Sequence, residues 1–205
     1  MPRLLGRKTI RYDSVTSTNE VLKALALEGI ETGTLVTAKV QTHGRGRLER
    51  RWESPEGGLW MSVLFEMPPG FDSSRYGLLP LMAGASVATA ILMEHGLDAG
   101  VKWPNDVLIA GRKACGILGE IFTVGDRHLA IIGIGINVNN RVQVGYDFSS
   151  GTTSIAEEFG KSVKTEVLEN TVLEELEFRH DLLVSGEYDK ILEDWRELSV
   201  TLGRK

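Results

Sequence analysis

The stretch that decides the fold is residues 116–138, GILGEIFTVGDRHLAIIGIGINV. Two apolar runs, residues 116–122 and 128–138, flank Gly125-Asp126, a dipeptide typical of hairpin turns. We therefore predict two antiparallel strands at the centre of a sheet. The second run carries glycine at positions 133 and 135, and alternate glycines on one face of a strand leave room either for a flat ligand or for close packing.

Working outward, apolar and β-branched runs predict further strands, and helical periodicity predicts amphipathic segments on both sides. The helix expected after Ser17 has the S-x-x-E spacing of a capping box and should stop at Gly29. This order favours an α+β fold with a central mixed, largely antiparallel sheet flanked by helices. The further predicted strands are residues 9–13, 34–40, 60–65, 100–103 and 107–109, and the other helices are residues 78–94, 165–185 and 187–198.

Composition excludes several classes of protein. The 205 residues suit one domain, and the single Cys115 excludes an internal disulfide or a cysteine-rich zinc site. The apolar stretches 78–93 and 129–138 are expected to be too short or too interrupted to span a bilayer, which takes about 20 apolar residues. Residues 1–11 have no apolar core of a signal peptide. We therefore expect a cytoplasmic protein with no membrane partner.

The charge distribution points to a small anionic ligand. The net charge of −5 argues against generic nucleic-acid binding. Arg45, Arg47, Arg50 and Arg51 nevertheless crowd into one segment, QTHGRGRLERRW at residues 41–52. Glycine lets backbone approach a ligand, and arginine offers planar donors for phosphate or carboxylate. The segment lacks the pattern of a phosphate-binding Walker loop, so a solvated basic loop remains the alternative interpretation.

Three later segments carry polar groups at predicted strand ends. KWPND at residues 102–106 must turn at its proline and would present Lys102, Asn105 and Asp106; its alternative is an ordinary turn. In GRKACGILGE at residues 111–120, Lys113 could neutralise developing charge or simply snorkel. GIGINVN at residues 133–139 offers the polar edge of Asn137.

Taken in order, Ser17-Thr18-Asn19, GRGR, KWPND, GRKACGIL and GIGINVN resemble the catalytic domain of the biotin protein ligase family, over residues 10–140. The resemblance implies the fold shared by biotin and lipoate ligases, which is similar to that of class II aminoacyl-tRNA synthetases. It implies that ATP and biotin react to give biotinyl-5'-AMP, with Mg²⁺ present. A lysine of a biotin carboxyl carrier protein then accepts the biotinyl group. Family habit also suggests a homodimer.

Residue roles follow from the same resemblance. It implies Lys113, Arg45 and Arg47 as catalytic groups, with Lys113 the main one. No metal ligand is implied beyond Asp106, acting through Mg²⁺. Biotin would contact Ser17, Thr18, Asn19, Gln41, Gly44, Arg45, Lys113 and Gly116; ATP or the adenylate would contact Arg47, Trp52, Lys102, Asn105, Asp106 and Asn137.

The chain also departs from the family pattern. Leu48-Glu49 stands where many members have Arg-Gly, which places a carboxylate near the expected adenylate. We expect residues 1–200 to be the catalytic domain and residues 201–205 to begin a C-terminal β-barrel that is missing or truncated. Two alternatives stay open: a lipoate or octanoate ligase or transferase of the same fold, and an adenylate-binding domain with impaired turnover.

Overall fold

A computed structural model describes residues 4–48, 50–141 and 151–202. Within these residues, seven strands form one sheet in the order β1-β2-β3-β7-β6-β5-β4. The β1–β2 pair is parallel and the other described pairs are antiparallel, so the predicted mixed, largely antiparallel sheet is confirmed. The strands are β1 (Thr9–Val15), β2 (Leu35–Gln41), β3 (Leu59–Glu66), β4 (Ala99–Lys102), β5 (Asp106–Ile109), β6 (Arg112–Val124) and β7 (Arg127–Ile136).

The predicted hairpin is formed by β6 and β7, which pair along almost their whole length. Gly125 takes a positive φ of 58° in the turn, a conformation that glycine adopts without strain. The first of these strands begins at Arg112 rather than at Gly116, because its opening residues pair with β5. Lys113 therefore lies inside a strand and has a fixed direction.

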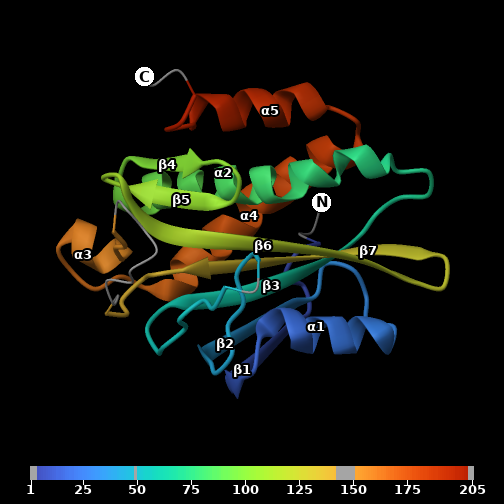
Figure 1. Ribbon diagram of the computed structural model, residues 1–205, viewed down its shortest axis with the longest axis horizontal. Coiled ribbons are helices and arrows are strands. Elements are labelled where there is room, and N and C mark those ends of the chain that lie inside the picture. The colour runs from blue at the N-terminus through green and yellow to red at the C-terminus, as the bar shows by residue number, and fades with distance from the viewer. Residues whose placement is uncertain (1–3, 49, 142–150, 203–205) are drawn as a thin grey trace.

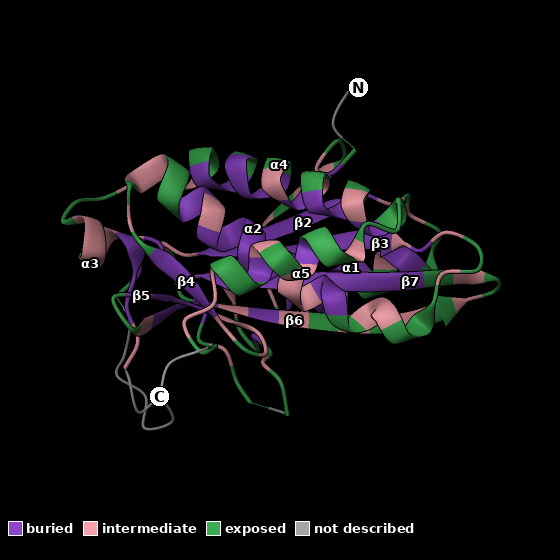
Figure 2. Ribbon diagram, turned by 90° about the horizontal axis from the view of Figure 1, so that it is seen from above, coloured by how far each residue is buried: buried purple, intermediate pink, exposed green. Residues whose placement is uncertain are grey.

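Helices cover both faces of the sheet (Figure 1). On one face, α1 packs against β2, β3 and β7; on the other, α2 packs against the sheet and is covered in turn by α4 and α5. Seen from above, buried residues follow the sheet beneath α2 and α4 (Figure 2). The helices are α1 (Thr18–Leu27), α2 (Leu78–His95), α3 (Ile155–Phe159), α4 (Thr165–Val184) and α5 (Tyr188–Glu197), with a 3-10 turn η1 (Ser73–Gly77) before α2.

Strand β7 contributes side chains to the hydrophobic cores on both faces of the sheet. Leu129 and Ile131 belong to the small core under α1, whereas Ile132 and Ile134 belong to the large core under α2 and α4. Alternate side chains of a strand point to opposite faces, so Gly133 must lie on the α1 face. The functional cavity opens on that face, beyond the first turn of α1.

One segment of the described chain, Ser73–His95, is long and apolar enough to cross a membrane. This corrects the expectation that the apolar stretch 78–93 is too short or too interrupted to do so. Its apolar character has a packing explanation, since Met82, Val87 and Ile91 of α2 are fully buried in the large core. The segment is the central helix of the fold, held between the sheet and α4.

After α5 the chain returns to the sheet beside β4. Val101 donates from its N–H to Leu198 O at 2.9 Å and accepts from Val200 N–H at 3.0 Å. The predicted start of a β-barrel at residues 201–205 falls mostly outside the described residues and stays a prediction. The same holds for Glu49, which is not among the described residues.

Candidate functional site

A cavity of about 590 Å³ opens between the first turn of α1, the 42–58 loop and the β4–β5 turn. Its floor is formed by β6 and β7, where Gly116 pairs with Gly135 and Leu118 with Gly133. Of the residues predicted to form the site, twelve line this cavity: Ser17, Thr18, Asn19, Gln41, Arg45, Arg47, Trp52, Lys102, Asn105, Asp106, Lys113 and Gly116.

The polar end of the cavity lies at the start of α1. Ser17 is the N-cap residue, but its side chain makes no capping hydrogen bond, so the predicted capping box is wrong. Instead, Oε1 of Gln41 accepts from the N–H of Thr18 at 2.8 Å. A side chain at the end of β2 thus satisfies an N–H group that the helix itself leaves unpaired. This arrangement ties the end of β2 to the helix and brings Gln41 beside Thr18.

The side chain of Asn19 lies directly against β7 at Gly133. A Cβ at Gly133 would come within 2.2 Å of Asn19 Oδ1, so a side chain at that position is incompatible with this placement. The buried Ser62 donates to Asn19 Oδ1 at 2.6 Å, and Asn19 Nδ2 donates to Glu120 Oε2 at 2.8 Å. Both ends of the Asn19 amide are therefore fixed.

Trp52 lies on the glycine floor. A Cβ at Gly135 would meet Trp52 Nε1 at 2.5 Å, and one at Gly116 would meet its ring at 3.0 Å. The Nζ atom of Lys113 lies 5.0 Å from the centroid of the same ring. Nε1 of Trp52 is buried and has no hydrogen-bond partner among the described residues, which is unusual for an indole N–H. An acceptor atom of a bound ligand would satisfy it.

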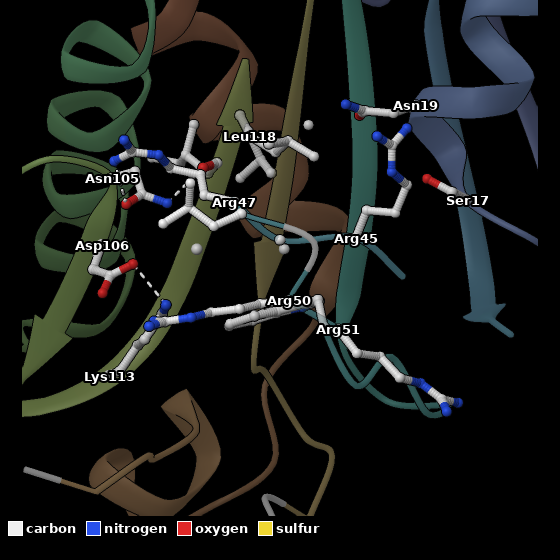
Figure 3. A pocket seen from close by; sticks show the side chains of 18 of the residues that line it. Ser17, Asn19, Arg45, Arg47, Arg50, Arg51, Asn105, Asp106, Lys113 and Leu118 are labelled. Atoms are coloured by element: carbon white, nitrogen blue, oxygen red, sulfur yellow. Dashed lines mark hydrogen bonds and ion pairs between the residues drawn. The ribbon is translucent and has the colours of Figure 1, made fainter. Parts of the chain in front are cut away.

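The opposite end of the cavity is cationic and faces the β4–β5 turn (Figure 3). Lys113 Nζ forms an ion pair with Asp106 Oδ1 at 2.6 Å. Asn105 is fixed by two bonds to Ile117, one from its side-chain Nδ2 to Ile117 O at 2.8 Å and one from Ile117 N–H to its own carbonyl at 2.9 Å. Arg47 donates to Asn105 Oδ1 at 3.4 Å. The predicted groups Lys102, Asn105 and Asp106 are thus brought together with Lys113.

The loop arginines separate toward different ends of the cavity. Arg47 points to the cationic end, whereas Arg45 lies near Asn19 and Ser17 at the polar end (Figure 3). Arg45 Nη1 donates to Glu120 Oε1 at 3.3 Å. Arg51 points away and donates to Thr42 O at 3.2 Å. Arg45 and Lys113 therefore do not meet in this arrangement.

Two predicted residues do not line the cavity. Asn137 is buried, and its amide donates to Thr153 O and accepts from Asn140, both at 3.1 Å. Gly44 lies close to the backbone of Trp52, because a Cβ at position 44 would come within 2.3 Å of Trp52 O. Gly44 thus packs against the backbone of Trp52, which lines the cavity, whereas the partners of Asn137 lie outside the cavity lining. The cysteine is not a nucleophile candidate, because burial raises the pKa of the Cys115 thiol.

Sequence reasoning missed Ser62 and Glu120, which complete the polar end. Ser62 lies in the apolar run of β3, and Glu120 lies in the exposed half of β6. The available signal was alternation: Glu120 shares a strand face with Gly116 and Leu118, both of which line the cavity.

Comparison with known proteins places these features in a family. The model of the biotin/lipoate A/B protein ligase family matches residues 12–137. The bifunctional ligase/repressor BirA of Bacillus subtilis is 41% identical over 140 residues, which is 67% of this chain and 42% of that protein. The chain therefore spans about two fifths of the length of such relatives. The biotin–[acetyl-CoA-carboxylase] ligase of Mycobacterium tuberculosis is 28% identical over 193 residues, 92% of this chain and 70% of that protein.

Solved structures agree with the sequence match. A biotin protein ligase from Aquifex aeolicus in complex with biotin and ATP is 31% identical and superposes with a TM-score of 0.83, covering 97% of this chain and 81% of that one. A biotin protein ligase from Leishmania major in complex with biotinyl-5-AMP is 27% identical with a TM-score of 0.76, covering 97% of this chain and 85% of that one. With a family model that matches more than half of its residues, the chain belongs to the biotin/lipoate A/B protein ligase family.

Proposed function

We propose that this chain is the catalytic part of an ATP-dependent biotin protein ligase. The observation that carries the proposal is one cavity with two chemically different ends. The polar end is built from uncharged groups of Thr18, Asn19 and Gln41, and the cationic end carries Lys102 and Lys113. A urea-containing acid and a nucleoside triphosphate need this combination.

In the first step, an oxygen of the biotin carboxylate attacks the α-phosphorus of ATP. A phosphorus–oxygen bond forms, the bond to the β-phosphate oxygen breaks, and pyrophosphate leaves with that electron pair. Both reactants are anions, so the site must neutralise charge at phosphorus. We assign this role to Lys113 and Arg47, with Lys102 beside them. The Asp106 carboxylate fixes Lys113 Nζ at 2.6 Å, which directs the ammonium group along the cavity.

Placement of the acid follows from the polar end. We propose that the ureido group of biotin lies against Ser17, Thr18, Asn19 and Gln41, and that the apolar bicycle lies at Gly116, from which the Trp52 ring would move aside. The carboxylate would then point along β6 toward Lys113. The Trp52 ring, displaced from the glycine floor, would cover the adenylate.

In the second step, the neutral ε-amine of a carrier-protein lysine attacks the acyl carbon. The carbon–nitrogen bond forms, the carbon–oxygen bond to AMP breaks, and the amine loses a proton. We propose a biotin carboxyl carrier protein as the acceptor. Support comes from the exposed position of two apolar residues at the cavity, Trp103 and Leu48, which are 66% and 83% exposed, because exposed apolar groups favour protein contacts.

We propose that Mg²⁺ enters with ATP. Among the described residues no group of three or more acidic, histidine or cysteine side chains could hold a metal. Asp106 is the one carboxylate among the described residues lining the cavity. This donor set fits Mg²⁺, which is commonly held by one or two carboxylates and the phosphates of its substrate. Its chemistry would be charge neutralisation on the phosphates.

The test is exchange of labelled pyrophosphate into ATP, with biotin, lipoate and octanoate supplied in parallel. Exchange with biotin alone is the expected result, because the cavity has a polar end that an alkyl chain or dithiolane ring cannot satisfy. Exchange with lipoate or octanoate alone would overturn the proposal in favour of the acyl-ligase alternative. Binding of biotinyl-AMP without exchange would identify an adenylate binder instead.

A further inference from the structure

Four oxygen atoms follow one another at the polar end of the cavity. They are Gln41 Oε1, Thr18 Oγ1, Ser62 Oγ and Asn19 Oδ1, and successive separations are 3.1, 2.7 and 2.6 Å. Each of the three separations is short enough for a hydrogen bond. The two inner atoms are hydroxyl oxygens, each with one hydrogen to donate.

Both outer atoms are fixed as acceptors. Gln41 Oε1 faces the backbone N–H of Thr18 at 2.8 Å, while its Nε2 donates to Ser54 Oγ at 2.8 Å. At the other end, Glu120 Oε2 lies 2.8 Å from Asn19 Nδ2. A carboxylate only accepts, so the Asn19 amide must turn its NH₂ group to Glu120 and its oxygen to the serine hydroxyl.

The four oxygens therefore make three successive contacts, but only the two hydroxyl hydrogens of Thr18 and Ser62 are available to fill them. One contact is left without a hydrogen whichever way the hydroxyls of Thr18 and Ser62 rotate. The four oxygens therefore carry more lone pairs than the two hydroxyl hydrogens can satisfy, so this end of the cavity favours a ligand that brings an N–H donor. A urea brings two such donors, whereas a dithiolane ring or an alkyl chain brings none.

We propose that Glu120 is a positioning residue that sets this hydrogen-bond polarity through Asn19, and thereby selects acids whose head group donates N–H. This inference rests on the proposed biotin ligase function. Glu120 is itself held in place, since its second oxygen accepts from Arg45 at 3.3 Å. Asn19 keeps its position because Gly133 carries no side chain beneath it.

The first test is Glu120→Gln, which keeps the size of the side chain. Arg45 can only donate, so the introduced amide must turn its oxygen to Arg45 and its NH₂ to Asn19. The Asn19 amide then flips and donates to the serine hydroxyl, which supplies the missing hydrogen and removes the site for a ligand N–H. We expect KM for biotin in pyrophosphate exchange to rise about tenfold, as for one lost buried hydrogen bond. We expect kcat at saturating biotin to stay within about twofold, because the cationic end is untouched.

The decisive variant is the reciprocal pair Asn19→Asp with Glu120→Gln. The introduced amide donates to one oxygen of the introduced carboxylate, whose other oxygen accepts from Ser62 as in the natural protein. Polarity and total charge are both restored, so the two substitutions should compensate and KM for biotin should return to within about threefold of the natural value. A role that is merely structural would predict a further loss in the double variant.

The matched control is Glu66→Gln, which removes a carboxylate paired with Arg127 at 2.8 Å and lying outside the cavity lining. It should leave KM unchanged. An unchanged KM in Glu120→Gln, an equal fall in kcat, or a double variant weaker than both single variants would overturn the inference. Failure of the natural protein to exchange with biotin is a separate result, which would remove the proposed function before any variant is compared.

Discussion

Lys113 Nζ lies 2.6 Å from Asp106 Oδ1, and both side chains are largely shielded from solvent. The pair connects the start of β6 to the β4–β5 turn, so the main cation of the cavity has a defined direction before any ligand binds. A preorganised charge of this kind stabilises a transition state without reorganisation.

Replacing Lys113 with alanine should therefore remove catalysis more than folding. We expect the rate of biotin-dependent pyrophosphate exchange to fall about 10²- to 10³-fold, the range for one lost electrostatic contact in an active site. Lys39→Ala is the matched control, because Lys39 pairs with Asp13 on an exposed part of the sheet. Near-normal exchange by the Lys113 variant would contradict its assignment.

Arg47→Ala should shorten the lifetime of bound biotinyl-AMP. Arg47 reaches Asn105 at the cationic end, where the adenylate phosphate is proposed to lie, and a charge-assisted contact is worth about 1.5–3 kcal/mol. Dissociation measured by stopped-flow fluorescence should accelerate about tenfold or more. Arg51→Ala, in the same loop but pointing away, should dissociate at the natural rate; equal effects from both would show a general loop effect.

Gly135→Ala should disturb the cavity floor without disturbing the core. Its Cβ would collide with Trp52 Nε1 at 2.5 Å, so the indole must move and the loop with it. We expect a loss of biotin affinity measured by calorimetry of about tenfold. In Gly119→Ala the nearest atom would be Ile132 Cδ1 at 3.5 Å, an ordinary contact on the opposite strand face, so this control should bind normally. If both variants bind normally, Trp52 does not rest on the floor as described.

Acid should destabilise the protein through His180. Burial lowers the pKa of His180. Its ring centroid lies 5.0 Å from that of Phe65 in a tilted arrangement, and neither ring nitrogen has a hydrogen-bond partner within the described part of the chain. The unfolded chain therefore binds this proton first, and folding stability that is present above pH of about 6.5 is lost as pH falls below it.

His180→Leu tests this statement because it keeps an apolar contact and removes the titration. The fall in melting temperature between pH 7.5 and 5.5 should be smaller in this variant than in the natural protein. His128→Leu, at an exposed position on β7, should leave the fall unchanged. A similar fall in the His180 variant and the natural protein would assign the acid sensitivity elsewhere, with the partly buried His95 the next candidate, since burial lowers its pKa as well.

Much of this architecture could be predicted from residue pattern. The β6–β7 hairpin was predictable because Gly125-Asp126 separates two apolar runs, and α2 because its apolar run closes at Gly96, which takes a left-handed conformation. The first residues of β6 were not, since their extended conformation depends on pairing with β5, a contact between segments that no local pattern encodes. The short helix α3 was missed for a different reason: its five residues are too few to show a helical period.

The candidate site, too, was predictable only in part. Glycines and arginines that form a sequence motif could be placed near a ligand, but their individual directions could not. Arg45 and Arg47 are two residues apart and point to opposite ends of one cavity. Ser62 and Glu120 carry no motif, and their importance depends on the row of contacts in which they take part.

The alternation along β7 has an evolutionary consequence. Ile132 and Ile134 face the large core, where apolar side chains of similar volume can replace one another at small cost. Gly133 and Gly135 face Asn19 and Trp52, where a single added carbon collides. We therefore expect neighbouring positions of one strand to be under different selection, with residues of one class interchangeable at Ile132 and Ile134 and almost no substitution accepted at Gly133 and Gly135. A saturation-mutagenesis map of this strand should show fitness alternating with a period of two.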